Sequence, residues 1–461
     1  MAFLKSIAAL TFALILATSA SRAAERPPNF VIMLCDNLGY ADVEPFGSEL
    51  HRTPNLNRMA AEGRKFTHFY SASGVCTPSR AALMTGSYPK RIGLAHTESD
   101  GAVLRPVSPS GLNPDEITIA EVLKEQGYAT AMFGKWHLGD QDKFLPTRQG
   151  FDVYYGVPYS DDMTPRPGKN WPPLPYMHNE TVIDAPVDRN GLTRREAKHA
   201  IEFIETHQDE PFFVYIPHAM PGSTRAPFSS EKFRGKSANG PYGDSVEELD
   251  WAAGEILETL RRLDLAKNTL VIWTSDNGAP RRNPPQGRNT PLAGWGYSTA
   301  EGGMRVPMIA WWPGTVPAGT TCDELATMMD LLPTFAKLAG TQPPSDRVID
   351  GKNIVPLLLG KEGAESPHEA FYYYQKETLE AIRAGDWKLY VAMENKPARL
   401  FDVRTDPGEK QNLAAEHPDV VARLEKLAEQ ARQDLGSGAE SGERVRPLGH
   451  VESPVAQVME E

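Results

Sequence analysis

The chain has 461 residues, with 48 lysines and arginines against 60 aspartates and glutamates, a formal net charge of −12. This acidic balance argues against nucleic acid and against an anionic membrane surface as partners, because both attract basic proteins. Three cysteines are too few for a disulfide scaffold, and the length predicts one large domain with a smaller second one.

Residues 1–24 predict a secretory signal peptide. Lys5 precedes an apolar run from Ile7 to Ala17, and small residues continue to Ala24. The run is shorter than a membrane-spanning helix requires. We therefore expect an exported protein, periplasmic or secreted, or lysosomal or extracellular if the source is eukaryotic.

Short apolar segments alternate with helical patterns over the first three quarters of the chain. The segments are "NFVIML", "YATAMF", "FFVYI", "LVIWTS" and "MIAWW", and helices are predicted near Thr118–Gln126, Arg194–Thr206 and Ser245–Leu263. This alternation predicts an α/β sheet covered by helices. Ligands bind such sheets at the carboxyl ends of the strands. The polar residues that follow the strands are Asp36, Asn37, Lys135, His137, His218, Asp276 and Asn277.

The stretch "GVCTPSRAALMTG" (residues 74–86) predicts a helix with a cysteine at its start. Thr77 is the expected N-cap and Pro78 the first helical residue, which places Cys76 in front of unpaired backbone N–H groups. An anion is favoured there, and Arg80 adds a positive charge. The alternative interpretation is an ordinary capped helix behind a buried thiol.

Two carboxylates and two amides, in Asp36-Asn37 and Asp276-Asn277, form a set of oxygen ligands. Such a set suits Ca²⁺ or Mg²⁺ better than zinc, which prefers nitrogen and sulfur. Each pair taken alone also fits an ordinary turn.

Residues 25–350 are predicted to form the catalytic domain and residues 351–436 a small C-terminal α+β domain. The segments "FYYYQ", "LEAIRAGDWKLYVAM" and "ARLFDV" predict antiparallel strands, and an amphipathic helix is expected over Pro418–Leu435. Residues 437–461 are predicted to be a polar, loosely ordered tail.

Several motifs resemble the type I sulfatases. "CTPSR" matches their signature Cys-x-Pro-Ser-Arg, and "GKWHLG", "SDNGA", "EGGMRVP" and "LFDVRTDPGEKQNLA" resemble further blocks in the same order, from about Pro28 to Leu413. The resemblance is closest to the group that contains arylsulfatase A and N-acetylgalactosamine-6-sulfatase. It implies an alkaline-phosphatase-like, mainly parallel mixed sheet, a bound Ca²⁺, and conversion of Cys76 to formylglycine by a separate formylglycine-generating enzyme.

The resemblance further implies a sulfuric ester hydrolase that works through a covalent sulfo-enzyme intermediate. The expected substrate is a sulfated carbohydrate or an aryl sulfate. The residues it places at the metal are Asp36, Asn37, Asp276, Asn277 and the group formed from Cys76. Arg80 is expected to steady the hydrated aldehyde, and Lys135, His137 and Ser160 of "GVPYSDD" to bind the sulfate or the nucleophile.

Three positions depart from the family pattern. Asn37 stands where a second aspartate is usual, Gly222 where a catalytic histidine is usual, and Gly296 where a sulfate-binding lysine is usual. The candidates to replace the histidine and lysine are His218, Arg225, Arg281 and Arg282, each of which also fits a surface or structural role.

The Pro-rich segment Met163–Met177 could offer Trp171 and Tyr176 as a stacking surface for a sugar, or it is simply a loop. Two other functions stay open at this stage. One is a formylglycine-dependent phosphate or phosphonate monoester hydrolase. The other is a non-catalytic protein that binds sulfated glycans.

Overall fold

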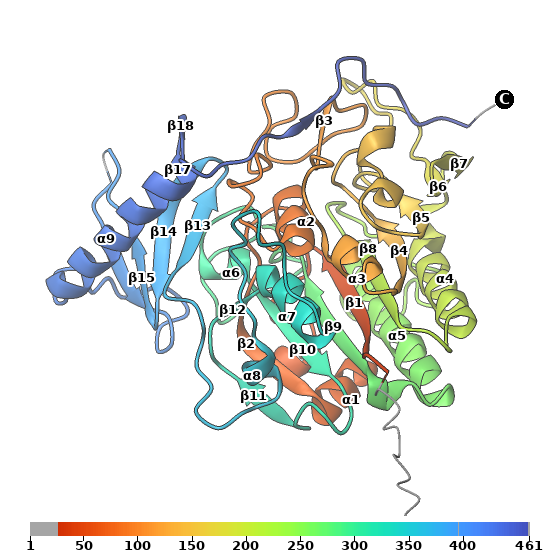
Figure 1. Cartoon of the computed structure of the whole chain (residues 1–461), viewed down its shortest axis with the longest axis horizontal. Helices are drawn as coiled ribbons and strands as arrows, with labels where there is room; N and C mark the ends of the chain where they lie inside the picture. The colour runs from red at the N-terminus through yellow and green to blue at the C-terminus, as the bar shows by residue number, and fades with distance from the viewer. Residues whose placement is uncertain (1–25, 395, 460–461) are drawn as a thin grey trace, which may run out of the picture.

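A computed structural model describes residues 26–394 and 396–459. The predicted signal peptide, residues 1–24, lies outside the described residues. The chain forms a large sheet covered by helices and a small sheet beside it, at the left of Figure 1. No helix in the described ranges is long and apolar enough to cross a membrane.

The large sheet has eleven strands and is mixed. Its centre is parallel, because β1 pairs in parallel with β8 and β9, and β4 pairs in parallel with β8 and β5. The order across the sheet is β11 (Thr320–Cys322), β2 (Arg64–Tyr70), β10 (Arg305–Trp311), β9 (Thr269–Ser275), β1 (Asn29–Asp36), β8 (Phe212–Pro221), β4 (Ala129–Lys135), β5 (Val153–Val157), β6 (Tyr176–His178) and β7 (Thr181–Asp184), with β12 (Ala326–Thr327) paired to β2. All five predicted strands are confirmed.

Helices cover both faces of this sheet. Along β1, Phe30, Ile32 and Leu34 pack into one core layer, while Val31 and Met33 pack into the other. This alternation is expected of a strand buried on both faces. The first layer contacts α2 (Cys76–Thr85), α3 (Ile119–Lys124) and α7 (Leu331–Leu338); the second contacts α1 (Pro54–Glu62), α4 (Leu192–Thr206) and α5 (Gly240–Arg262).

The small sheet is antiparallel and forms the C-terminal unit. Its strands, in order, are β13 (Phe371–Gln375), β14 (Thr378–Ala384), β15 (Trp387–Tyr390) and β16 (Arg399–Asp402), and α9 (Pro418–Leu435) packs against it. The predicted strands and helix are therefore confirmed. Ile354 and Leu357, at the short helix α8 (Val355–Leu358), pack in the core of the large unit instead. By its packing, the C-terminal unit begins nearer to Phe371 than to residue 351.

A buried ion pair joins the two units. Glu301, in the short helix α6 (Glu301–Met304), accepts hydrogen bonds from Tyr70 (2.5 Å) and Tyr373 (2.9 Å) and from Lys388 Nζ (3.1 Å). Tyr70 belongs to the large sheet, whereas Tyr373 and Lys388 belong to the small one. The carboxylate therefore links both sheets at one point.

The segment after α9 returns to the large unit, in contrast to the loosely ordered tail that its composition predicts. It forms the short hairpin of β17 (Gly436–Ser437) and β18 (Glu440–Ser441), and then β19 (Gly449–His450) pairs with β3 (Ser110–Gly111). Arg446 binds Glu116 at 2.7 Å. The blue trace in Figure 1 shows this path over the large unit. Polar side chains suffice here because backbone pairing and an ion pair hold the segment.

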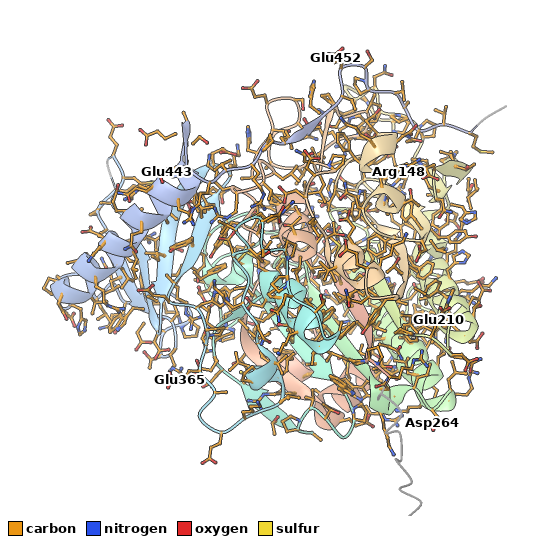
Figure 2. All side chains as sticks on the ribbon, in the orientation of Figure 1. Arg148, Glu210, Asp264, Glu365, Glu443 and Glu452 are labelled. Carbon is orange, nitrogen blue, oxygen red and sulfur yellow. The ribbon has the colours of Figure 1, made fainter. Side chains whose placement is uncertain are left out.

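Figure 2 shows Glu210, Asp264, Glu443 and Glu452 at the edge of the molecule in this view. Other charged side chains, such as Asp36 and Lys135, are buried.

Candidate active site

The polar residues at the strand ends meet at one edge of the large sheet. Asp36 ends β1, Lys135 ends β4 and Asp276 follows β9 directly. These strands are parallel, so their carboxyl ends share an edge. Lys135 Nζ donates to Asp36 Oδ2 at 2.8 Å, and both side chains are buried.

Cys76 is the first residue of α2, and Val75 is its N-cap. The prediction of Thr77 as N-cap was wrong, because the Thr77 hydroxyl donates to the carbonyl of His137 (3.0 Å) and accepts from the N–H of Leu104 (3.2 Å). The Cys76 sulfur lies 3.1 Å from Asp36 Oδ1. Burial, together with the charges of Asp276 and Asp36, raises the pKa of the thiol well above its usual value.

Arg80, one turn into α2, holds both carboxylates. Its Nε and Nη2 donate to Asp276 Oδ2 at 3.0 and 2.8 Å, and Nη2 lies 3.4 Å from Asp36 Oδ1. Burial alone would raise the pKa of Asp36, but Lys135 and Arg80 outweigh it and hold that pKa below its usual range. Burial and the negative charge of Asp36 raise the pKa of Asp276. Two cations therefore balance two buried carboxylates.

The oxygen-rich pocket around these residues fits a hard divalent cation. One ligand atom each from Asp36, Cys76 and Asp276 lies within 4.8 Å of the others. Asn277 Nδ2 donates to Asn37 Oδ1 at 2.6 Å, which brings the two amides together. Among the described residues, the buried Oδ1 of Asn277 has no hydrogen-bond partner. An unpartnered buried oxygen beside two carboxylates fits the ligand set that Ca²⁺ prefers.

His137 and Ser160 lie next to this cluster. Nε2 of His137 donates to the carbonyl of Leu104 at 3.0 Å, while its buried Nδ1 has no partner among the described residues. Burial, with the nearby charges of Lys135 and Arg80, lowers the pKa of His137 well below its usual value. The ring is therefore neutral, with an Nδ1 lone pair available. Ser160 Oγ accepts from Lys135 Nζ at 3.1 Å, which leaves its proton free to donate.

A cavity of about 340 Å³ opens beside Cys76. Its walls include Cys76, His137 and Ser160, as well as two residues that the sequence reasoning did not assign, Ser223 and Tyr297. The Tyr297 hydroxyl lies 3.2 Å from Ser223 Oγ, and Asn37 Nδ2 donates to the same Oγ at 3.0 Å. Tyr297 has a φ of 70°, an uncommon conformation for a tyrosine, and it directly follows Gly296.

The two glycine departures are imposed by the backbone. Gly222 has a φ of 71°, and a Cβ there would lie 2.6 Å from the carbonyl oxygen of Ala219. A Cβ at Gly296 would lie 2.2 Å from the carbonyl oxygen of Gly278. Neither a histidine at 222 nor a lysine at 296 fits this backbone without a shift.

The four replacement candidates lie in different places. His218, in β8, is buried and donates through Nδ1 to Glu196 Oε2 at 2.5 Å, and it does not line the cavity. Arg225 and Arg281 are exposed and also lie outside the cavity wall. Arg282 donates a hydrogen bond to the carbonyl of Ser223 and so holds the loop that contains Ser223. None of the four reaches the cavity with its charged or titratable group in this arrangement.

Two further side chains near the site differ from expectation. Tyr176 is fully buried in β6, beneath the guanidinium of Arg195, so it does not contribute to the sugar-stacking surface that the sequence left as an alternative. Asp161 was not predicted to matter. It directly follows Ser160, its two carboxylate oxygens are buried without a partner among the described residues, and burial together with the charge of Asp162 raises its pKa to about 8.

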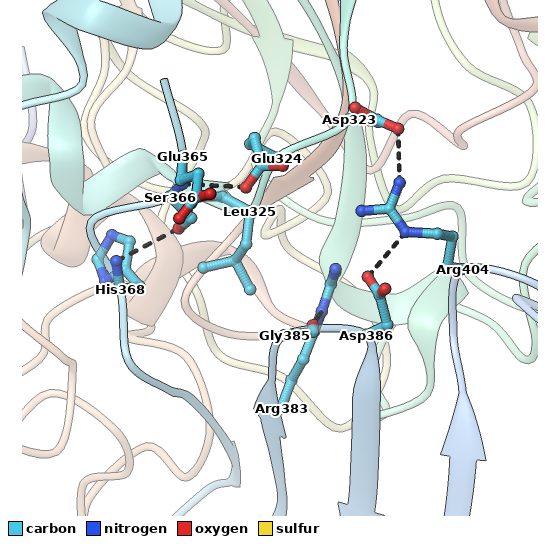
Figure 3. A pocket seen from close by; sticks show the side chains of 10 residues that line it. All are labelled: Asp323, Glu324, Leu325, Glu365, Ser366, His368, Arg383, Gly385, Asp386 and Arg404. Carbon is cyan, nitrogen blue, oxygen red and sulfur yellow. Dashed lines mark hydrogen bonds and ion pairs between the residues drawn. The ribbon is translucent and has the colours of Figure 1, made fainter. Parts of the chain in front are cut away.

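A second cavity of about 310 Å³ lies where the two units meet (Figure 3). Its polar side chains satisfy one another: Arg404 binds Asp323 (2.7 Å) and Asp386 (2.9 Å), and the N–H of Ser366 donates to Glu324 (3.0 Å). It contains none of the predicted site residues. We therefore regard it as part of the junction between the units.

Comparisons with known proteins agree with this geometry. The family described as Sulfatase matches residues 28–341, and the family described as N-sulphoglucosamine sulphohydrolase, C-terminal, matches residues 298–434. The chain is 36% identical to N-acetylgalactosamine-6-sulfatase from Canis lupus familiaris, over 90% of this chain and 88% of that protein. It is 37% identical to arylsulfatase A from Homo sapiens, over 90% and 89% respectively.

A solved structure shares the arrangement. Ps i-CgsB in complex with k-i-k-neocarrahexaose superposes with a TM-score of 0.75 at 31% identity, covering 88% of this chain and 92% of that one. The mainly parallel sheet, the cysteine at the start of α2 and the match over two thirds of the sequence point the same way. This chain accordingly belongs to the sulfatase family, as an enzyme of the arylsulfatase-like kind.

Proposed function

We propose that this sulfatase hydrolyses a sulfate ester of a carbohydrate outside the cytoplasm, with a formylglycine formed from Cys76 and a Ca²⁺ held beside it. The observation that carries the proposal is the position of Cys76. It is buried at the first residue of α2, in contact with Asp36, on the wall of a cavity whose other polar groups converge on it.

The thiol itself is unsuited to nucleophilic catalysis. A cysteine nucleophile needs a lowered pKa, whereas burial and two carboxylates raise the pKa of Cys76. The signature around it instead makes it a substrate for a formylglycine-generating enzyme. When formed and hydrated, the aldehyde would supply one hydroxyl whose oxygen bonds to sulfur as the sulfur–oxygen bond to the alcohol breaks, and a second hydroxyl whose deprotonation would expel sulfate and restore the aldehyde.

Asp36, Asn37, Asp276 and Asn277 would hold the Ca²⁺, with the group formed from Cys76. The ion would supply positive charge that stabilises negative charge developing on the sulfate and the nucleophile. The chain offers two carboxylates here, because Asn37 replaces the usual second aspartate. A site with fewer negative ligands binds calcium more weakly.

The chain's own residues complete the polar surroundings of the sulfate. Lys135 and Arg80 place two fixed positive charges at the site, where low dielectric strengthens their attraction for an anion. Ser160 can donate its hydroxyl proton, because its oxygen already accepts from Lys135. Nδ1 of His137 can accept a proton from a hydroxyl at residue 76, since its ring is held neutral.

Ser223 and Tyr297 directly follow Gly222 and Gly296, the glycines that stand where a histidine and a lysine are expected in the family, and both line the cavity. Desolvation around its hydroxyl raises the pKa of Tyr297 above its usual value, although 41% of the residue is exposed, so the group is protonated at neutral pH and can donate a hydrogen bond. Its partner Ser223 is tied to Asn37 at the metal pocket. We assign this pair to the departing alcohol oxygen, with Tyr297 as the donor.

The relatives support a carbohydrate substrate, since one solved structure contains k-i-k-neocarrahexaose and one relative is named N-acetylgalactosamine-6-sulfatase. Export rests on the sequence of residues 1–24 alone.

The experiment is turnover of matched aryl sulfate and aryl phosphate by protein made in a host that forms formylglycine. We expect the sulfate to be preferred and mass spectrometry of the Cys76 peptide to show the aldehyde or its hydrate. A strong preference for phosphate would move the assignment to a phosphate or phosphonate monoester hydrolase. An active sample whose Cys76 is wholly unmodified would refute the formylglycine.

A further inference from the structure

A cluster of three cations surrounds Trp171, outside the cavity that contains Cys76. The Arg166 guanidinium lies 4.9 Å from the centre of the indole ring, the Lys169 ammonium 5.3 Å and the Arg105 guanidinium 5.8 Å. Arg105 also lines the cavity. The cluster is therefore continuous with the site already described.

The backbone holds the two outer cations on the same side. Arg166 and Lys169 form an antiparallel bridge, in which the N–H of Lys169 donates to the carbonyl of Arg166 at 2.9 Å. Gly168, with a φ of 76°, makes the tight turn between them. Side chains of directly paired residues point to the same face of such a hairpin. The turn therefore presents Arg166 and Lys169 together.

These cations lack an acidic partner. Within residues 26–394 and 396–459, none of the three forms an ion pair, whereas the neighbouring basic residues Lys124, Lys135, Arg148 and Arg195 each do. Arg105 Nε donates only to a neutral group, the carbonyl of Asp100, at 3.0 Å. Asp162, the carboxylate on the cavity wall, is not paired with Arg105.

Gathering three positive charges around one ring is unfavourable without a counter-charge. The indole face attracts each cation weakly but leaves the net positive charge in place. Each charge lies within 5.8 Å of the same ring centre, so their mutual repulsion acts over distances comparable with the screening length of about 8 Å at physiological salt. In a chain of net charge −12, such a cluster is not a by-product of basic composition. A bound anion would relieve the repulsion.

We propose that Arg105, Arg166 and Lys169 form, around Trp171, a second anion-binding subsite for an oligosaccharide. It takes a further sulfate or carboxylate group of the same sugar chain whose scissile sulfate lies at residue 76. This inference rests on the proposed function and narrows it, because it requires a substrate of at least two sugar units with more than one negative group. Arg105 bridges the two subsites.

The test measures binding to the full-length Cys76→Ala chain, which cannot turn over its ligand. Three probes are titrated by calorimetry: galactose 6-sulfate, an iota-carrageenan hexasaccharide that carries sulfates only, and a chondroitin 6-sulfate hexasaccharide that carries sulfates and carboxylates. We expect Arg166→Gln/Lys169→Gln to lower the affinity for the hexasaccharide that binds more tightly by about tenfold. The double substitution should also make that affinity less dependent on salt concentration. Galactose 6-sulfate, which cannot span both subsites, should keep its affinity.

The matched control is Arg423→Gln/Lys426→Gln, which removes the same charge from exposed positions on α9. Arg166→Lys/Lys169→Arg keeps the charges and should retain most of the affinity, which separates charge from loop structure. Equal weakening by the two glutamine variants, or none by either, would overturn the subsite while galactose 6-sulfate binding upholds the sulfatase site. Failure of all three sugars to bind would overturn the carbohydrate substrate, and the subsite with it.

Discussion

The hydroxyl of Tyr297 lies 3.2 Å from Oγ of Ser223, on the wall of the cavity that Cys76 also lines. Both residues come from segments where the backbone forbids the usual basic side chains, since a Cβ at Gly222 or Gly296 would meet a carbonyl oxygen at 2.6 or 2.2 Å. Each glycine is followed directly by a hydroxyl-bearing residue. Two neutral hydroxyl donors, Ser223 and Tyr297, thus stand directly after Gly222 and Gly296.

Tyr297→Phe removes the hydroxyl and leaves the ring. We expect the rate on a sugar sulfate to fall by about 10²-fold, because a poor leaving group needs a proton donor. The rate on 4-nitrophenyl sulfate should change by less than about threefold, since nitrophenolate leaves unaided. The measurement is kcat for both substrates with each protein. Equal losses on both, or none on either, would show that Tyr297 does not serve the leaving group.

Tyr155→Phe is the control for this substitution, because Tyr155 is half-buried in β5 and packs between His178 and His199, with rings 4.2 and 4.0 Å away. It should leave both rates unchanged. His218→Gln is informative too. Its ring binds Glu196 and does not line the cavity, so any loss should be equal on the two substrates.

Asn37→Asp adds one negative charge to the proposed calcium pocket. We expect bound Ca²⁺ to be retained about tenfold more strongly, because affinity rises with the number of charged ligands. Ser223 can turn its hydroxyl to donate to the new carboxylate, which preserves the contact now made by Asn37 Nδ2. Metal content after dialysis against graded chelator is the readout. Asp276→Asn should have the opposite effect, and identical retention in all three proteins would contradict the metal assignment.

The elements with a strong local pattern were predictable from sequence. β1, β8 and β9 are continuous apolar runs, and α9 matches its predicted bounds because Leu424, Leu427, Ala428 and Ala431 share one face. The strand-end residues Asp36, Lys135 and Asp276 were predictable for the same reason, since parallel strands bring their carboxyl ends together.

What escaped prediction depends on contacts that are distant in sequence. Threonine is a residue type that often caps helices, yet the Thr77 hydroxyl forms hydrogen bonds with the backbone of residues 104 and 137 instead. The tail after residue 436 is polar, and its order comes from pairing with β3 and from Glu116, more than 300 residues earlier. Tyr297 belongs to no recognised motif. Its position directly after Gly296 is the one sequence feature that could have marked it as a candidate site residue.

Glu301→Gln should strongly destabilise the fold. The buried carboxylate faces Lys388, Arg305 and Arg383, which outweigh its desolvation and lower its pKa to about 2. Its neutralisation leaves Arg305 without its ion-pair partner and Lys388 with Glu409 alone. Breaking a buried ion pair in this way typically lowers the free energy of unfolding by about 3–5 kcal/mol. Urea unfolding of the purified proteins measures this. Glu429→Gln, which breaks an exposed pair with Arg432 at 3.1 Å, should change stability by less than about 1 kcal/mol. Similar values for the two variants would refute the role of Glu301.

His68, in β2, is a buried histidine whose ring is kept neutral by burial and by nearby positive charges. Neither ring nitrogen has a hydrogen-bond partner among the described residues. Burial, with the positive charges of Arg305 and Arg383, lowers the pKa of His68 to about 2. In the unfolded chain the pKa returns to about 6.5. Between these values the unfolded state binds a proton that the folded state does not.

The contribution of His68 to stability is therefore fully present above about pH 6.5 and decreases as the pH falls, by about 1.4 kcal/mol per pH unit for one fully shifted group. We expect the free energy of unfolding to drop between pH 6.5 and 5.5, and His68→Gln to reduce that drop by about 1 kcal/mol, because glutamine does not titrate. Urea unfolding at both pH values measures the difference between the two slopes rather than the absolute stability, so a general loss of packing in the variant does not obscure it. His450→Gln, at an exposed position, should leave the slope as in the parent chain. If His68→Gln also leaves the slope unchanged, His68 is protonated in the folded protein and the assignment of a neutral buried ring is wrong.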